Sequence, residues 1–126
     1  MMKNKHKLEE FIQDLERERS LLLKLDGEGA LEARFVLNQI FETRISILQD
    51  YLPETPEDER ESEYDCYSAI FFQLDDAEDM MRFQIKLCEG RDGGKMVISY
   101  LREAIEKIIS MRKRYKAEYS KSIYEN

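Results

Sequence analysis

One stretch with a helical repeat, residues 67–88, limits the folds that this chain can adopt more than any other part of the sequence. Its apolar or small residues recur at alternating spacings of three and four, interrupted only at Gln84. They are Tyr67, Ile70, Leu74, Ala77, Met81 and Cys88. Residues spaced in this way share one face of an α-helix. Further apolar residues beside this seam make the apolar surface wider than one neighbouring helix can cover, which predicts a central helix of a bundle or a helix in an oligomer interface.

The residues around this helix indicate where it begins and ends, and how many other helices accompany it. Thr55 and Pro56 suit a helix start, and Gly90 can take the left-handed conformation that ends a helix. A proline-containing corner and two glycine-rich turns separate four apolar repeats. We therefore predict an all-α protein, a four-helix up-down-up-down bundle whose long third and fourth helices form a projecting hairpin. It is expected to be a single domain over residues 1–126, with helices at about residues 5–24, 30–51, 56–89 and 95–120.

The first and second helices are expected to have a simple division between buried and exposed faces. In the first helix, the sequence places Asp14 on the outer, charged face. The second helix is expected to bury a stripe that also includes Asn38, where a polar residue more often fixes the register of packing than performs chemistry. The apolar members of that stripe are Leu31, Phe35, Phe41, Ile45, Leu48 and Leu52.

The composition indicates a protein that lies in the cytoplasm. The longest uninterrupted apolar run, residues 69–72, is far shorter than the roughly 20 residues that cross a membrane. No apolar segment with a cleavage site follows the basic first residues, so no secretory signal is expected. Cys66 and Cys88 lie on the same predicted helix, about 33 Å apart at 1.5 Å per residue, and cannot bond each other. We interpret both as reduced packing residues.

Charge is unevenly distributed along the chain, whose formal net charge is -7. Residues 54–79 contain eleven acids and one base, whereas residues 107–121 contain six bases and one acid. An antiparallel pairing of the third and fourth helices would bring the acidic start of one beside the basic end of the other. Both charges would also suit their helix dipoles. This pairing alone can account for the basic end.

The leading functional hypothesis is a non-catalytic protein–protein interaction module, because no catalytic constellation is found. Such a chain would be a small acidic adaptor or inhibitor of the phage or host-defence type, binding a protein partner through its acidic face or through the apolar surface of the hairpin. The predicted acidic face comprises Glu57, Asp58, Glu61, Asp75, Asp76, Glu78 and Asp79. The surface predicted for a homodimer comprises Phe72, Met80, Phe83, Ile98, Ile105 and Ile109.

A magnesium-dependent, all-helical nucleotide phosphohydrolase is an alternative hypothesis, based on the carboxylates of residues 75–79. Like charges at i,i+3 and i,i+4 destabilise a helix unless a cation or an arginine relieves them, and Arg82 is suitably placed. No second set of carboxylates on the other helices has convincing spacing. We therefore assign no metal ligand and no cofactor. His6 is the only histidine, which argues against nucleophilic catalysis.

A nucleic-acid contact through the basic end of the fourth helix is a further alternative. Arg112, Lys113, Arg114 and Lys116 could contact phosphates, and nearby tyrosines could stack on bases. The net charge of -7 repels polyanions at long range, so only a local patch could bind. The sequence therefore disfavours nucleic acid as a partner.

Overall fold

The structure is a computed structural model that describes residues 4–54 and 60–125 of the chain, with side chains for residues 4–53 and 63–124. Its elements are α1 (Asn4–Leu21), η1 (Leu22–Lys24), α2 (Ala30–Tyr51), η2 (Leu52–Glu54), α3 (Arg60–Cys88) and α4 (Gly94–Glu125), where η denotes a short 3-10 helix. The prediction of an all-α bundle is confirmed. None of the helices in these ranges combines the length and the apolar character that a membrane span requires.

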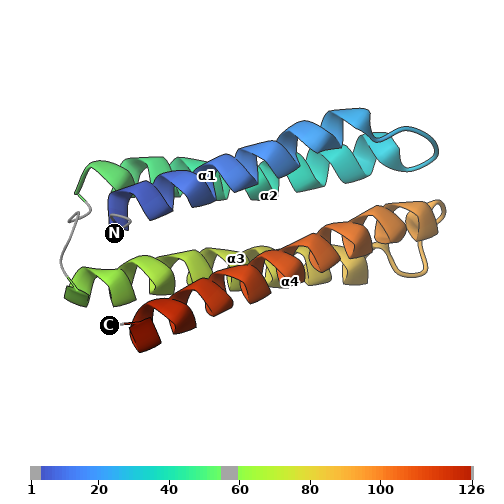
Figure 1. The fold of residues 1–126 in the computed structure, drawn as a ribbon. Coiled ribbons are helices and arrows are strands. Elements are labelled where there is room, and N and C mark those ends of the chain that lie inside the picture. The colour runs from blue at the N-terminus through green and yellow to red at the C-terminus, as the bar shows by residue number, and fades with distance from the viewer. Residues whose placement is uncertain (1–3, 55–59, 126) are drawn as a thin grey trace.

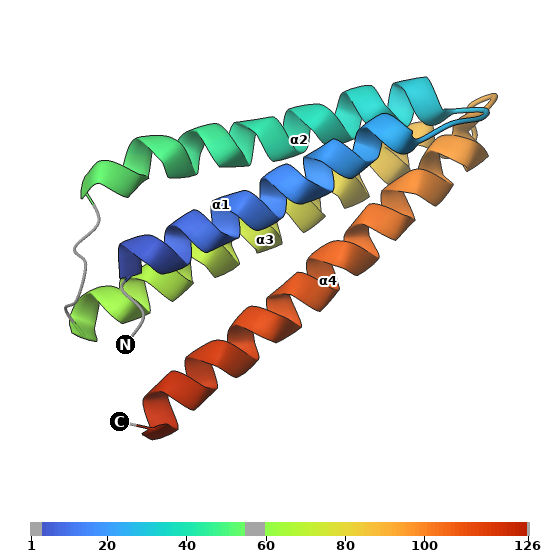
Figure 2. The same cartoon turned by 45° about the horizontal axis from the view of Figure 1, so that its top comes forward.

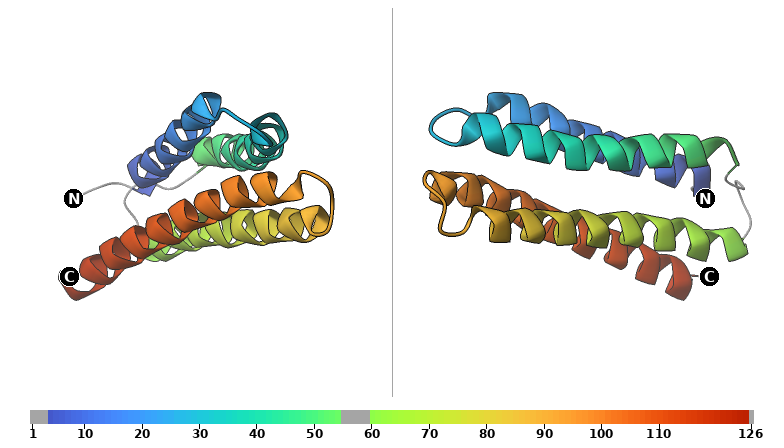
Figure 3. Two further views of the ribbon diagram at one scale, coloured as in Figure 1. Left: turned by 90° about the vertical axis from the view of Figure 1, so that its right-hand side faces the viewer. Right: turned by 180° about the vertical axis from the view of Figure 1, so that it is seen from behind.

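The four helices form two layers, one made by α1 and α2 and the other by α3 and α4 (Figure 1, Figure 3). The α1–α2 turn and the α3–α4 turn lie at the same end of the molecule. The first residues of α1 and the last residues of α4 lie together at the opposite end (Figure 1). The helix bounds agree closely with those expected, except that α4 continues to Glu125 and that residues 55–59, where we placed the start of the third helix, lie outside the described ranges.

The core is a single cluster of side chains from all four helices. The seam predicted for α3, from Tyr67 to Cys88, is buried throughout. The seam of α4 is buried as well, and it consists of Val97, Leu101, Ala104, Ile108, Met111 and Tyr115. In α1 the buried apolar residues are Leu8, Phe11, Ile12 and Leu15. The helical periodicity of the sequence therefore identified most of the core correctly.

The starts of α2 and α4 pass very close to each other. Gly29 precedes α2 in the left-handed conformation, with φ of 78°. A Cβ atom added to Gly29 would lie 2.9 Å from Cβ of Met96 and 3.0 Å from the backbone nitrogen of Val97. Only small side chains fit beside such an approach, and the first buried residues of α2 are Ala30 and Ala33.

This close approach explains why one prediction for α2 is wrong. We expected Leu31 and Phe35 to be buried, but they are 73% and 65% exposed. The helix instead directs its small residues inward at this end, which leaves the large ones outside. The buried residues of α2 are Ala30, Ala33, Leu37, Ile40, Phe41, Arg44, Ile45 and Leu48.

The α3–α4 hairpin is longer than the α1–α2 pair, with helices of 29 and 32 residues against 18 and 22. It is nevertheless covered for most of its length. The carbonyl oxygen of Asn4 accepts a 3.5 Å hydrogen bond from the thiol of Cys66, and Lys7 contacts Glu118. The hairpin that we expected to project therefore lies alongside α1 and α2 for most of its length, and the start of α3 extends past the start of α1 (Figure 1, Figure 2).

Candidate interaction surface

Arginines from α3 and α4 neutralise much of the acidic cluster predicted at residues 75–79. The Nε atom of Arg112 lies 2.9 Å from Oδ1 of Asp75, and its Nη2 atom lies 2.7 Å from Oε1 of Glu78. Arg82 donates a 2.8 Å hydrogen bond to the other carboxylate oxygen of Glu78, as its position on the helix predicted. The hydrogen bonds from Arg112 and then Arg82 lower the pKa of Glu78 below its usual value. The acidic stretch of α3 and the basic stretch of α4 are therefore paired, as the sequence suggested.

The remaining members of the acidic face do not lie together. Asp76 points to the other side of α3 and forms a 2.7 Å ion pair with Arg44 of α2, a residue whose side chain is buried. Asp79 is exposed and forms no ion pair with any other described residue. Glu57 and Asp58 lie outside the described residues, and the side chain of Glu61 is not described. The structure therefore shows no continuous acidic face among the residues whose side chains it describes.

The predicted basic segment is also divided. Arg112 faces the acidic cluster of α3, and Arg114 contacts the carboxylate of Asp14 in α1. Lys113 and Lys116 are exposed and form no ion pair with another described residue. Two of the four basic side chains are thus occupied within the bundle.

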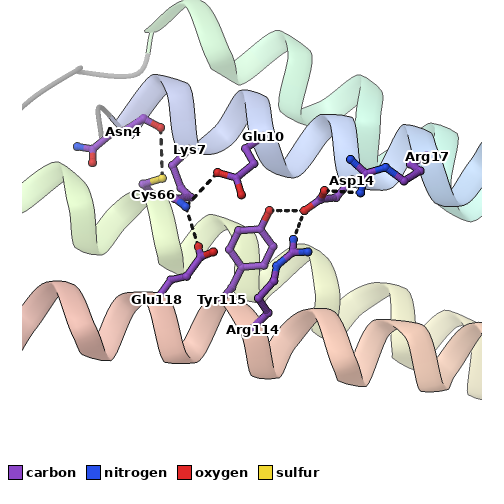
Figure 4. A network of polar contacts seen from close by, with 9 residues as sticks. All are labelled: Asn4, Lys7, Glu10, Asp14, Arg17, Cys66, Arg114, Tyr115 and Glu118. Atoms are coloured by element: carbon purple, nitrogen blue, oxygen red, sulfur yellow. Dashed lines mark hydrogen bonds and ion pairs between the residues drawn. The ribbon is translucent and has the colours of Figure 1, made fainter. Parts of the chain in front are cut away.

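A buried polar network joins α1 to α4, and the sequence did not predict it (Figure 4). Asp14, which we placed on the outer face of α1, is only 5% exposed. Its carboxylate accepts a 2.6 Å hydrogen bond from the hydroxyl of Tyr115, a second bond from Arg114 and a 3.1 Å bond from Arg17. The spacing of Asp14 from Phe11 places it at the edge of the apolar seam, which was the available signal.

Lys7 extends this network toward the start of α1. Its ammonium group donates hydrogen bonds of 2.7 Å to Glu118 and 3.1 Å to Glu10 (Figure 4). Burial alone would lower the pKa of Lys7, but the bonds to Glu118 and Glu10 together raise it. The network thus contains charged groups that are compensated by partners, as buried ions require.

The network is needed because α1 and α4 are widely spaced. No Cα atom of α1 lies within 8 Å of a Cα atom of α4 in the described ranges. Tyr115, which is fully buried, fills the space between the two helices, with its ring 5.4 Å from that of Phe11 in an edge-to-face arrangement. The long side chains of Lys7 and Arg114 complete the bridge.

The chemistry available to this network is limited. Burial raises the pKa of the Cys66 thiol to about 12, so the thiol stays protonated and is a poor nucleophile. Burial, followed by the hydrogen bond to Asp14, raises the pKa of Tyr115. Among the described residues, no group of three or more histidine, cysteine or acidic side chains is arranged to hold a metal ion. We interpret the network as a means of holding α1 against α4.

A cavity of about 390 Å³ opens beside this network. It is lined by Glu18, Glu106, Lys107, Ser110, Met111 and Arg114. Its two cations have partners inside the bundle, since Lys107 lies 3.1 Å from Glu18 and Arg114 contacts Asp14. The cavity therefore presents no unpaired cation that would select an anionic ligand.

Four large apolar side chains are exposed on α3. Phe72, Phe83 and Leu87 are 65%, 54% and 55% exposed, and Met80 is 39% exposed. The four residues lie at i, i+8, i+11 and i+15, which places them on one side of the helix, away from the seam that faces the core. We call these four residues the α3 apolar face.

The residues of α4 that we predicted to share this surface do not do so. Ile105 is buried in the core at 4% exposure, and Ile98 and Ile109 are partly buried against it. The reason is that α4 packs against α2 as well as α3, so both sides of its seam are covered. The exposed part of the predicted surface is therefore limited to Phe72, Met80 and Phe83, with Leu87 added.

Comparison with known proteins gives no relative from which a function could be transferred. No protein-family model matches this chain, and neither a curated protein nor a solved structure matches it. What the chain does must therefore be inferred from its own side chains.

Proposed function

We propose that this chain is a non-catalytic protein-interaction module of the cytoplasm that binds another polypeptide through the α3 apolar face. The observation that carries the proposal is the exposure of two phenylalanines, a leucine and a methionine on one side of one helix. Met80, Phe83 and Leu87 follow one another at i, i+3 and i+7, and adjoining exposed apolar side chains commonly mark a site of protein association. The opposite side of α3 is buried in the core, so the bundle holds this face rigidly.

The two cysteines support the proposed location in the cytoplasm. Cys66 and Cys88 are both free and buried. Free thiols are typical of proteins in reducing compartments, such as the cytoplasm.

The other candidate functions have less support from the contacts of their residues. The carboxylates of Asp75, Asp76 and Glu78 are each paired with an arginine, so few remain to bind magnesium or to imitate a polyanion. A nucleic-acid contact at the end of α4 would rely on Lys113 and Lys116, because the two arginines have partners within the bundle. The four side chains of the α3 apolar face are between 39% and 65% exposed.

The proposal is tested by quantitative affinity capture from cells that express the chain. Two versions with different tags are expressed together, so that association between copies is also counted. The test variant combines Phe72→Glu with Phe83→Glu on the α3 apolar face. The matched control combines Leu31→Glu with Phe35→Glu, because those residues are at least as exposed but lie on α2.

We expect at least one polypeptide to be captured by the natural chain and by the α2 control, and to be lost with the α3 variant. Circular dichroism must show that both variants remain helical. Capture that is equal for all three chains, or no capture above background, would reject the proposal.

A further inference from the structure

We infer that the α3 apolar face binds a second copy of this chain, with the two α3 helices packed antiparallel about a two-fold axis near Met80. This inference rests on the proposed function and specifies the partner. It follows from the order of the charged side chains along α3 and from one symmetric pair of apolar side chains.

One pair of apolar residues is placed symmetrically about the middle of the face, whereas Met80 and Phe83 would lie opposite Asp79 and Asp76 of the partner subunit. Phe72 and Leu87 are equally far in sequence from the midpoint between residues 79 and 80, and so are Asp76 and Phe83. In an antiparallel two-fold pair, residues that are equally far from the axis lie opposite each other. Phe72 would therefore pack against Leu87 of the partner subunit. Asp76 is half-buried and paired with Arg44, so its charge is already compensated within the bundle.

The charged residues beside the face are arranged so that one copy complements another. Asp75 and Asp79 come before the midpoint, and Arg82 and Lys86 come after it, on the same flank of the helix. In an antiparallel pair related by a two-fold axis, this flank of one α3 helix faces the same flank of the other. The two helices run in opposite directions. Asp79 would then lie beside Arg82 of the partner subunit, and Asp75 beside Lys86 of the partner subunit. In a parallel pair this flank would face the opposite flank of the partner helix, so its acids and bases complement each other only in the antiparallel arrangement.

Three of the four side chains needed for these contacts are accessible and available, and the fourth, Asp75, is exposed but already lies 2.9 Å from Arg112 of the same chain. Asp79 and Lys86 are exposed and form no ion pair with another residue in the described ranges. Arg82 is exposed and uses only its Nε atom to contact Glu78, which leaves its other guanidinium donors available. The complementary flank also offsets part of the repulsion between two chains that each have a net charge of -7.

The experiment is a charge swap in the purified full chain, followed by analytical ultracentrifugation over a range of concentrations. Asp79→Arg gives a chain with bases at both positions, and Arg82→Asp gives a chain with acids at both. Each variant alone would place like charges together twice in the dimer, so we expect each to dissociate at least about tenfold more readily than the natural chain. An equimolar mixture places opposite charges together twice and is expected to form a heterodimer.

Lys113→Glu is the control, because it changes the net charge by the same amount as Arg82→Asp at an exposed position on α4. It is expected to leave dimerisation nearly unchanged. A heterodimer formed only by the mixture supports the inference.

The remaining outcomes overturn the inferred dimer. They also show whether the proposed function fails with it. A natural chain that is monomeric at every concentration overturns the dimer, and the proposed function then stands or falls on whether capture of another protein depends on Phe72 and Phe83. A dimer that is indifferent to both charge variants, or a mixture that fails to associate, means that a different surface joins the copies.

Discussion

The hydroxyl of Tyr115 in α4 donates a 2.6 Å hydrogen bond to the carboxylate of Asp14 in α1, and the two residues are separated by 101 positions in the sequence. Both side chains are buried. The bond therefore joins the first helix to the last in a region where their backbones do not approach closely.

Replacing Tyr115 with phenylalanine should destabilise the bundle by about 1–2 kcal/mol, because a buried carboxylate oxygen loses its neutral donor while the ring packing is kept. Urea unfolding followed by circular dichroism measures this change. Tyr124→Phe is the control, since Tyr124 is almost fully exposed and its change should have no measurable effect. Equal stability of the two variants would show that the bond contributes nothing.

The bundle should lose stability as the pH rises above about 9, the ordinary value for a cysteine. Burial raises the pKa of Cys66 and of Tyr67 to about 12, and the pKa of Tyr115 is also raised. Above their ordinary values these groups lose protons in the unfolded chain but keep them in the folded one, so alkali favours unfolding. Each group contributes a loss of up to about 1.4 kcal/mol per pH unit, until the pH passes its folded-state pKa. Urea titrations at increasing pH measure the effect, and a flat profile up to pH 12 would contradict it.

The thiol of Cys66 should react with thiol reagents only when the chain unfolds, because it is buried and stays protonated. The measurement is the rate of labelling by a chromogenic disulfide reagent in a chain that carries Cys88→Ala. The rate should increase with urea in parallel with the unfolded fraction. Rapid labelling in the absence of urea would show that the start of α3 is accessible in the folded protein.

Gly94→Ala should destabilise the bundle by about 2 kcal/mol or more, because the added methyl group would meet the carbonyl oxygen of Cys88 and force the α3–α4 turn apart. Gly93→Ala is the matched control. Gly93 has a positive φ of 77° but open space around it, so its substitution should cost only about 1 kcal/mol of backbone strain. Thermal unfolding of both variants gives the comparison, and a larger effect at Gly93 would contradict it.

Glu78→Gln should reduce stability by about 1 kcal/mol at neutral pH, through weaker bonds to Arg112 and Arg82. The pKa of Glu78 is lowered in the folded state, so its contribution is present above the ordinary value of 4.5 and is lost as the pH falls through the folded-state pKa. The difference between the variant and the natural chain should therefore disappear in acid. A difference that stays constant in acid would mean that the glutamine disturbs packing instead.

Much of the fold could be predicted from local features of the sequence. The repeats of three and four found the buried seams of α3 and α4, and Gly90 ends α3 as expected. The pairing of Arg112 with the carboxylates of α3 was also predictable, because the two helices that carry these charges are neighbours in the chain and turn back on each other.

The failures come from contacts between segments that are distant in sequence. Asp14 looked like a surface residue because nothing in α1 indicates that Tyr115 and Arg114 will meet it. Phe35 looked like a core residue because nothing in α2 reveals how closely Gly29 approaches α4. For the α3 apolar face, periodicity suggested Phe72, Met80 and Phe83, but only the packing of α4 on α2 showed that Ile105 is not part of it.

The wide spacing of α1 and α4 also determines how the molecule responds to force. The first residues of α1 and the last residues of α4 lie at the same end of the bundle (Figure 1). A pull applied between them would load the contact of Lys7 with Glu118 first and the contact of Asp14 with Tyr115 afterwards. Such contacts carry the load one at a time and break in sequence. The bundle should therefore open at low force even if it resists heat and urea well.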